Sequence, residues 1–182
     1  MRSYKTEGIV IKRKNFGEAD RMLTVFTKNH GKIQIIAKGV RKITSRRSSH
    51  IELLNHASLG VYEGKMPILT EAQCINHHSG LKGDLKKAGY AFYICELIDG
   101  LLADHQENRI VFSLLQNTLF KLENEENPKA LLSRFEQELL SLLGFWPRER
   151  AFAVDSSVII ENIMERKIKT KRSARIARGH DS

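Results

Sequence analysis

The chain has 182 residues, and 41% of them are hydrophobic, which is enough for the packed core of one ordinary domain or two small ones. It contains no run of about 18 apolar residues and no apolar leader near its N-terminus, so we expect a cytoplasmic protein without a membrane span. The net charge of +9 is unevenly distributed. Residues 1–80 hold 14 of the 30 Lys and Arg but only six of the 21 Asp and Glu. This excess of positive charge favours a polyanionic partner for residues 1–80.

Residues 1–77 are predicted to form a small β-barrel. Short apolar and β-branched runs alternate with turn residues such as Asn29-His30-Gly31. The five predicted strands are Lys5–Arg13, Asp20–Thr27, Lys32–Lys38, Leu53–Tyr62 and Ile68–Asn76. Five short strands in so few residues are typical of a closed OB-type barrel, a fold that commonly binds nucleic acid.

The rest of the chain is predicted to be helical. Residues 78–83 are polar and rich in Gly, which predicts a linker. Beyond it, apolar residues recur every three or four positions, and Asn127-Pro128 and Gly144 are typical of a helix start and a helix end. A last helix is predicted from about Ser156 into the basic stretch 166–178. The sequence therefore predicts an α+β protein, with an OB-type barrel over residues 1–77 and an all-helical domain over residues 84–182 that ends in a basic helix.

Signatures of common enzyme classes do not occur in the sequence. There is no phosphate-binding loop ending in Gly-Lys-Ser/Thr, no Gly-x-Ser-x-Gly elbow and no His-Glu-x-x-His pair. Glu18 and Asp20 stand two positions apart, as metal-binding carboxylates on one strand face do, but no third or fourth carboxylate follows nearby. We interpret them as a charged turn that fixes a hairpin, and we expect a protein that is not an enzyme and has no cofactor.

The cysteines and nearby histidines suggest half of a zinc site. Cys74, His77 and His78 have suitable spacing, but a structural zinc ion needs four ligands and no second pair exists. Cys95 lies in a predicted apolar helix face. We therefore expect no metal site, and we interpret Cys74 and Cys95 as buried free thiols.

The strongest positive signal is the segment Lys38–His50. It contains no acidic residue among thirteen, and its glycine and serines allow close approach to phosphates. Its basic residues are Lys38, Arg41, Lys42, Arg46 and Arg47. A second cluster, Lys12-Arg13-Lys14, ends the first predicted strand. One such run can be a solvated loop, but two on one barrel favour a nucleic-acid surface whose affinity falls steeply with salt.

Aromatic residues for base stacking are sparse in the barrel. Phe26 lies in an apolar strand and is expected in the core. Phe16, which precedes Gly17, and Tyr62 are possible stacking platforms, with core packing an equally open alternative. We therefore expect weak sequence preference and binding that is largely electrostatic.

Short motifs occur in an order that resembles the bacterial recombination protein RecO family. In the barrel they are Gly17-Glu18-Ala19-Asp20-Arg21, Gly31-Lys32, and above all Ala37-Lys38-Gly39-Val40-Arg41 followed by Ser45-Arg46. In the helical part they are Ala91–Leu102, Asn108–Leu122 and Phe135–Pro147 with its closing Gly-Phe-x-Pro. The stretch Ile163–Arg175 is similar to that family's basic last helix. Together these motifs cover nearly the whole chain.

The resemblance implies a mediator of homologous recombination. Members bind single- and double-stranded DNA, anneal complementary strands, contact the acidic C-terminal tail of the single-strand DNA-binding protein and, with RecR, help to load the recombinase RecA. On this basis we expect nucleoid association and DNA binding by both basic clusters and the last helix. The residues concerned are Lys12, Arg13, Lys14, Lys38, Arg41, Lys42, Arg46, Arg47, Lys171, Arg172 and Arg175.

The sequence departs from the family in one respect and leaves two alternatives open. Many members carry a four-cysteine zinc module after the Gly-Phe-x-Pro helix, whereas here Arg148–Asp155 runs on without a cysteine. The resemblance therefore implies nothing about helical-domain packing or partner contacts that depend on this module. An RNA-binding OB module and a protein-interaction scaffold remain alternatives, because a basic barrel suits either nucleic acid.

Overall fold

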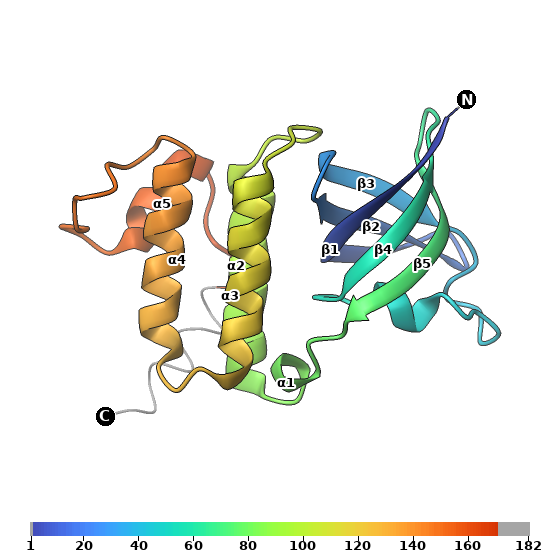
Figure 1. Ribbon diagram of the computed structural model, residues 1–182, viewed down its shortest axis with the longest axis horizontal. Coiled ribbons are helices and arrows are strands. Elements are labelled where there is room, and N and C mark those ends of the chain that lie inside the picture. Colours follow the sequence, from blue (N-terminus) through green and yellow to red (C-terminus); the bar gives the residue numbers. More distant parts are fainter. Residues whose placement is uncertain (1, 171–182) are drawn as a thin grey trace. The chain divides into compact units, whose positions relative to one another are not determined.

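The computed structural model describes residues 2–170 and divides the chain into two compact units (Figure 1). The first unit contains residues 1–78 together with Leu102–Phe112, and the second contains Ser79–Leu101 and the residues from 113 on. The basic residues Lys171, Arg172 and Arg175 lie outside the described residues. Within the described part of the chain, no helix has the length and apolar character needed to cross a bilayer.

The first unit is built on a closed five-stranded barrel. Its strands are β1 (Ser3–Phe16), β2 (Asp20–Thr27), β3 (Gly31–Ala37), β4 (His56–Tyr62) and β5 (Ile68–Asn76). They follow the order β1-β2-β3-β5-β4, and β4 closes the barrel by pairing with β1. All neighbours are antiparallel except β3 and β5, which pair in parallel where Ile36 faces Ile68. The predicted α+β fold, with a five-stranded OB-type sheet before the helices, is confirmed.

The largest differences from the predicted strand boundaries are at the end of β1 and at the start of β4. β1 continues to Phe16, so residues 12–14 lie inside the strand and do not end it. β4 begins only at His56, because Leu54 has a positive φ of 70° that a strand cannot accommodate. The Leu54 N–H donates to the carbonyl of Val10, and the Asn55 carbonyl accepts from the Val10 N–H. Tertiary hydrogen bonds therefore hold Leu54 and Asn55 outside the strand, and β4 begins late.

The barrel is filled by side chains that point inward from all five strands, as strand alternation requires. The cluster comprises Val10, Leu23, Val25, Ile33, Ile35, Ala37, Val40, Ile51, Ala57, Leu59, Val61 and Leu69. Val40 and Ile51 are not strand residues. Both lie in the segment between β3 and β4, Val40 near its start and Ile51 nearer its end. That segment is therefore fixed to the barrel core near both of its ends.

Residues 102–112 return from the helical region and pack on the barrel. Phe112 is buried, and its ring lies 6.0 Å from that of Phe26 and 6.0 Å from that of His56. Burial lowers the pKa of His56, although the nearby Glu7 carboxylate acts in the opposite direction. Gly31 has φ +66°, and a Cβ there would stand 2.3 Å from the backbone of Gln106. This packing requires glycine at the start of β3.

The second unit is helical. Its helices are α1 (Ser79–Lys82), α2 (Leu85–Leu101), α3 (Arg109–Asn124), α4 (Pro128–Leu142) and α5 (Ser156–Met164), with α3 beginning in residues of the first unit. α1 occupies most of the predicted linker. Asn127 caps α4 by accepting a hydrogen bond from the Ala130 N–H at 3.2 Å, as its sequence predicts. The hydroxyl of Tyr93 donates to buried Glu136, which also accepts from Ser156, so one carboxylate connects α2, α4 and α5.

The two cysteines are not joined in a disulfide. Cys95 is buried in α2, where desolvation and the nearby Asp99 raise the pKa of its thiol to about 12. It is therefore an inert core residue, as predicted. Cys74 is half-buried, so the prediction of full burial was wrong for this residue. Cys74 shares a face of β5 with Ala72 and Asn76, which are also half-buried, whereas the intervening Gln73 and Ile75 are exposed.

Candidate nucleic-acid interface

The acid-free segment of residues 38–50, here called the basic loop, leaves the end of β3 and leads towards β4. Lys38, Arg41, Lys42 and Arg46 are exposed on it. Among the described residues, Lys38, Lys42 and Arg46 have no ion-pair partner, so no carboxylate in that part of the chain pairs with their charges. The loop therefore presents uncompensated positive charge to solvent.

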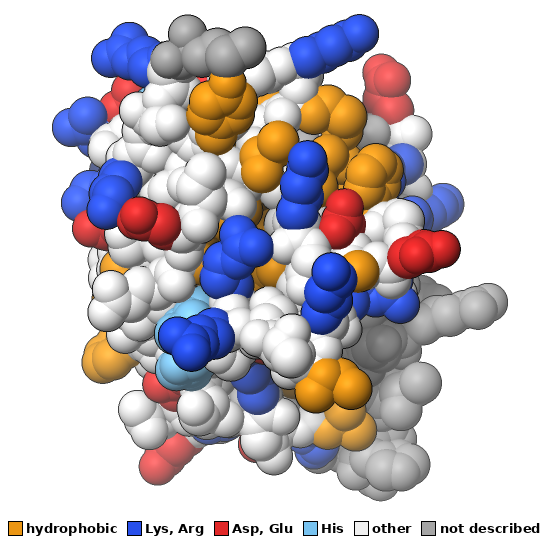
Figure 2. All heavy atoms as spheres, turned by 90° about the vertical axis from the view of Figure 1, so that its right-hand side faces the viewer, with side chains coloured by type: hydrophobic (Ala, Val, Ile, Leu, Met, Phe, Trp, Pro, Cys, Tyr) orange, Lys and Arg blue, Asp and Glu red, His pale blue; other side chains and the backbone are white. Residues whose placement is uncertain are grey.

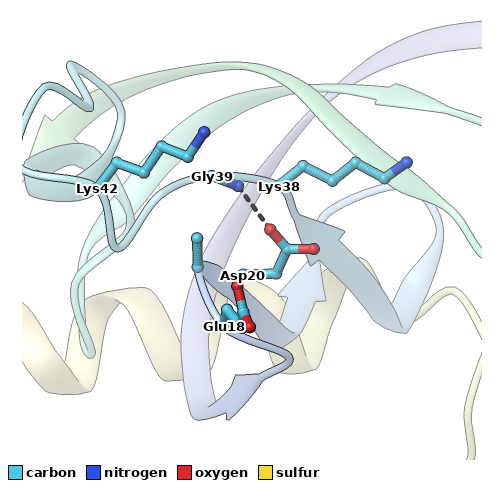
Figure 3. Close-up of a pocket in the computed structure, with 6 residues that line it drawn as sticks. Glu18, Asp20, Lys38, Gly39 and Lys42 are labelled. Carbon is cyan, nitrogen blue, oxygen red and sulfur yellow. Dashed lines mark hydrogen bonds between the residues drawn. The ribbon is translucent and has the colours of Figure 1, made fainter.

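The basic loop is held against the turn between β1 and β2. The Gly39 N–H donates a 2.7 Å hydrogen bond to Asp20 Oδ1, as Figure 3 shows. The Arg41 N–H donates to the carbonyl of Ala19 at 2.9 Å, and its Nη1 donates to that of Gly17 at 3.3 Å. Asp20 is therefore the residue that fixes the base of the loop. From the sequence we expected a charged turn that fixes a hairpin, whereas the Asp20 carboxylate binds the basic loop.

An open hollow of about 590 Å³ lies between this turn and the basic loop. It is lined by Glu18, Ala19, Asp20, Lys38, Gly39 and Lys42. In Figure 3 the Lys38 and Lys42 side chains extend from the loop on one side of the Asp20 carboxylate, and Glu18 lies on the other. Across the described residues, no group of three side chains is arranged to hold a metal ion. The hollow is thus lined by two lysines and two carboxylates.

Arg47 differs from the other basic residues of the loop because its guanidinium faces the protein backbone. Nη1 donates to the carbonyl of Leu69 in β5, and Nη2 donates to that of Lys38, both at 2.9 Å. These bonds join the start of the loop to a barrel strand. We therefore assign Arg47 a positioning role, which the count of basic residues in the sequence did not reveal.

The second cluster, residues 12–14, divides between two sides of β1. Lys12 and Lys14 are exposed, whereas Arg13 is partly buried. The Arg13 guanidinium forms an ion pair with Glu52, whose other carboxylate oxygen lies 3.7 Å from Arg21. Glu52 immediately follows the 3₁₀ helix Ser48–Ile51 at the end of the basic loop. The structure thus brings the end of β1 next to the basic loop, with Arg13 neutralised.

Removing the Glu52 charge is expected to strengthen DNA binding. In Glu52→Gln, Arg13 and Arg21 lose their carboxylate partner and become available to phosphates, so we expect about a two- to fivefold gain in affinity at low salt. The gain should disappear at high salt, where screening removes it. Fluorescence anisotropy with a labelled oligonucleotide measures this effect. Glu71→Gln, which removes the exposed carboxylate paired with Lys5 at 2.9 Å, is the matched control, and an equal gain there would contradict a local effect.

The two candidate stacking residues occupy different environments. Phe16 ends β1 directly before Gly17 and is 40% exposed, so its ring faces solvent next to the basic loop's anchor turn. Tyr62 ends β4, is half-buried and faces Ser3 and Ile68 on the neighbouring strands. Phe16 is thus the better placed of the two for contact with a base.

One exposed apolar residue of the basic loop was not considered in the sequence analysis. Ile43 has a relative exposure of 105%, the largest among the exposed large hydrophobic side chains of the described chain. The available signal was its position, an aliphatic residue among Lys, Arg, Thr and Ser in a segment without acids.

The wider surface around the barrel is also basic. Figure 2 shows Lys and Arg side chains across the middle of one face, with most of the Asp and Glu side chains in view nearer its margins. A polyanion lying across such a face meets mainly positive charge. The arrangement therefore suits an extended nucleic-acid backbone better than a single acidic side chain.

Comparison with known proteins matches both parts of the chain. A family model described as "Recombination protein O N terminal" matches residues 1–78, and one described as "Recombination protein O C terminal" matches residues 82–163. A DNA repair protein RecO from Roseiflexus sp. (strain RS-1) is 36% identical over 88% of this chain and 56% of its own length. The RecO proteins of Symbiobacterium thermophilum and Moorella thermoacetica are 34% and 36% identical, over 81% and 83% of this chain. The chain spans somewhat less than three-fifths of the length of these relatives (56%, 59% and 57%).

Proposed function

Because the chain belongs to the RecO family of DNA repair proteins, we propose that it takes part in homologous recombination by binding DNA through the basic loop. The observation that carries this proposal is the uncompensated charge of Lys38, Lys42 and Arg46 on a loop without acidic residues. Phosphate binding by such residues releases counterions and needs no sequence-specific contact. Both single- and double-stranded DNA are therefore ligands.

The basic loop supports binding because its shape is set before DNA arrives. Asp20, Arg47 and the buried side chains of Val40 and Ile51 each fix one part of it. A preorganised loop loses less conformational freedom on binding than a flexible one, so more of the electrostatic attraction appears as affinity. Lys12 and Lys14 on β1 extend the same surface.

Strand annealing follows from binding and needs no catalytic residue. Two complementary strands repel each other through their phosphates, and a basic surface that holds both lowers this repulsion. We propose that the protein acts in this way as a non-enzymatic mediator. Its proposed partners, taken from the family resemblance, are the acidic tail of the single-strand DNA-binding protein, RecR and, through them, RecA.

The test is the rate of annealing of two complementary oligonucleotides, with and without the single-strand DNA-binding protein. The chain should accelerate annealing of naked strands and also of strands coated by that protein. A competition between DNA and RNA of matched length tests the ligand class. Clear preference for RNA, or annealing no faster than with a generic cationic protein, would overturn the proposal.

A further inference from the structure

The tip of the basic loop carries an uncharged side chain, that of Ile43, whose placement the positive charge of the loop does not explain. The Lys42–Ser45 segment is a β-turn closed by a 2.9 Å hydrogen bond from the Ser45 N–H to the Lys42 carbonyl, and Ile43 is its first central residue. Ile43 is fully exposed, whereas Val40, three residues earlier, is buried in the barrel core. The turn therefore directs one aliphatic side chain into solvent between cationic neighbours.

The rigidity of the loop base prevents Ile43 from folding back onto the barrel. Gly39 is tied to Asp20, Arg41 is tied to Ala19 and Gly17, and Arg47 is tied to Lys38 and to Leu69 in β5. With both sides of the turn fixed, burial of Ile43 requires a ligand. The ligand must be anionic, because Lys42 and Arg46 flank the tip, and it must also offer an apolar face.

Unpaired nucleotides combine these two properties. Phosphates supply the negative charge, and the faces of unpaired bases supply an apolar surface that the stacked duplex hides. Aliphatic residues are also known to insert between partly unstacked bases in other proteins. Resting on the proposed function, we propose that Ile43 packs against unpaired bases while Lys42 and Arg46 hold the neighbouring phosphates. This contact gives the basic loop a preference for single strands without a preference for sequence.

The test separates bases from phosphates. The probes are an oligothymidylate and an abasic oligonucleotide of the same length, which carry the same charge. The full chain should bind the oligothymidylate about three- to tenfold more tightly, as expected for partial burial of one aliphatic side chain. Ile43→Ser should lose most of this preference through weaker binding of the oligothymidylate, and should bind the abasic probe as the unaltered chain does. The salt dependence should not change, because no charge is removed.

Control variants distinguish this inference from the proposed function on which it rests. Leu85→Ser removes an equally accessible aliphatic side chain, 91% exposed at the start of α2, and should keep the preference for bases. Arg46→Ala should weaken binding of both probes by the same factor. If Arg46→Ala has no effect, the proposed DNA surface fails. If Arg46→Ala behaves as expected but Ile43→Ser keeps the full preference for the oligothymidylate, or loses affinity for both probes equally, the role of Ile43 is overturned.

Discussion

Replacing Lys38, Lys42 and Arg46 together with Ala is expected to reduce affinity for single-stranded DNA by about 10- to 100-fold at low salt. Each lost phosphate contact removes about 0.7 from the slope of the logarithm of affinity against the logarithm of salt concentration on a single strand, so the slope should decrease by about 2. The three residues have no ion-pair partner among the described residues, so their removal leaves no carboxylate uncompensated. Folding should be unaffected.

The measurement is a series of anisotropy titrations at several salt concentrations. Lys28→Ala is the control. Lys28 directly follows the last residue of β2, whereas the basic loop is attached at Asp20, the first residue of that strand. The Lys28 ammonium lies 4.0 Å from the Glu7 carboxylate. The control should change neither affinity nor slope appreciably. An unchanged slope in the triple variant would mean that the loop does not contact phosphates. A decrease of the slope in Lys28→Ala by about one third of that in the triple variant would mean that binding depends only on net charge.

Arg47 is left out of this variant because of its two bonds to backbone carbonyls. Its replacement would release the loop from β5 and confound lost charge with lost structure. In the sequence, Arg46 and Arg47 are adjacent and equivalent, and nothing local distinguishes them. The distinction comes from Leu69, which is 22 residues away from Arg47 in the chain. Residue type and spacing therefore predict that the loop is basic but not which cations are available.

The same limit applies to the second cluster. The sequence places Lys12, Arg13 and Lys14 together, and the strand period of two predicts that the middle residue faces away from the others. It does not predict that Glu52, 39 residues later, neutralises that residue. Contacts between distant positions determine how much of a basic cluster is free for a ligand.

The fold was predictable where local signals are strong and mutually consistent. Five apolar runs separated by turn residues identified the barrel, and Asn127-Pro128 identified the start of α4. Prediction was incomplete for α2, where the three- and four-residue spacing of Ala88, Ala91, Phe92, Cys95 and Ile98 indicates a single apolar stripe. In the structure Phe92 is 39% exposed, whereas Ile94 and Leu97, outside that stripe, are buried. A helix that is buried on several sides lacks the one-sided period on which such a prediction depends.

The return of residues 102–112 to the barrel also has no local signal. Loop residues with a polar composition, such as Asp104 and Gln106, look like an ordinary connection between helices. Their structural importance depends on Gly31 and on Lys32, whose buried ammonium lies 3.2 Å from Asp104. These partners are more than 70 residues away in the chain, beyond the reach of any periodicity.

The largest stability effect is expected for Phe112→Ala. Its ring is 1% exposed and contacts the rings of Phe26 and His56, so truncation leaves a cavity and costs about 3–5 kcal/mol of the free energy of unfolding. Urea unfolding followed by circular dichroism measures this loss. Phe120→Ala, in the same helix but 60% exposed, makes the same chemical change and should cost less than about 0.5 kcal/mol.

Comparison of these two variants tests whether the barrel needs the returning segment. Phe26 lies on β2, the strand whose first residue, Asp20, fixes the basic loop. Phe112→Ala loosens the packing around Phe26. Its affinity for DNA should therefore also fall under conditions where part of the population is unfolded. Equal stability of the two variants would show that residues 1–78 form the barrel without help. A loss confined to Phe112→Ala would show that the unit with the proposed DNA surface depends on residues that follow the second helix.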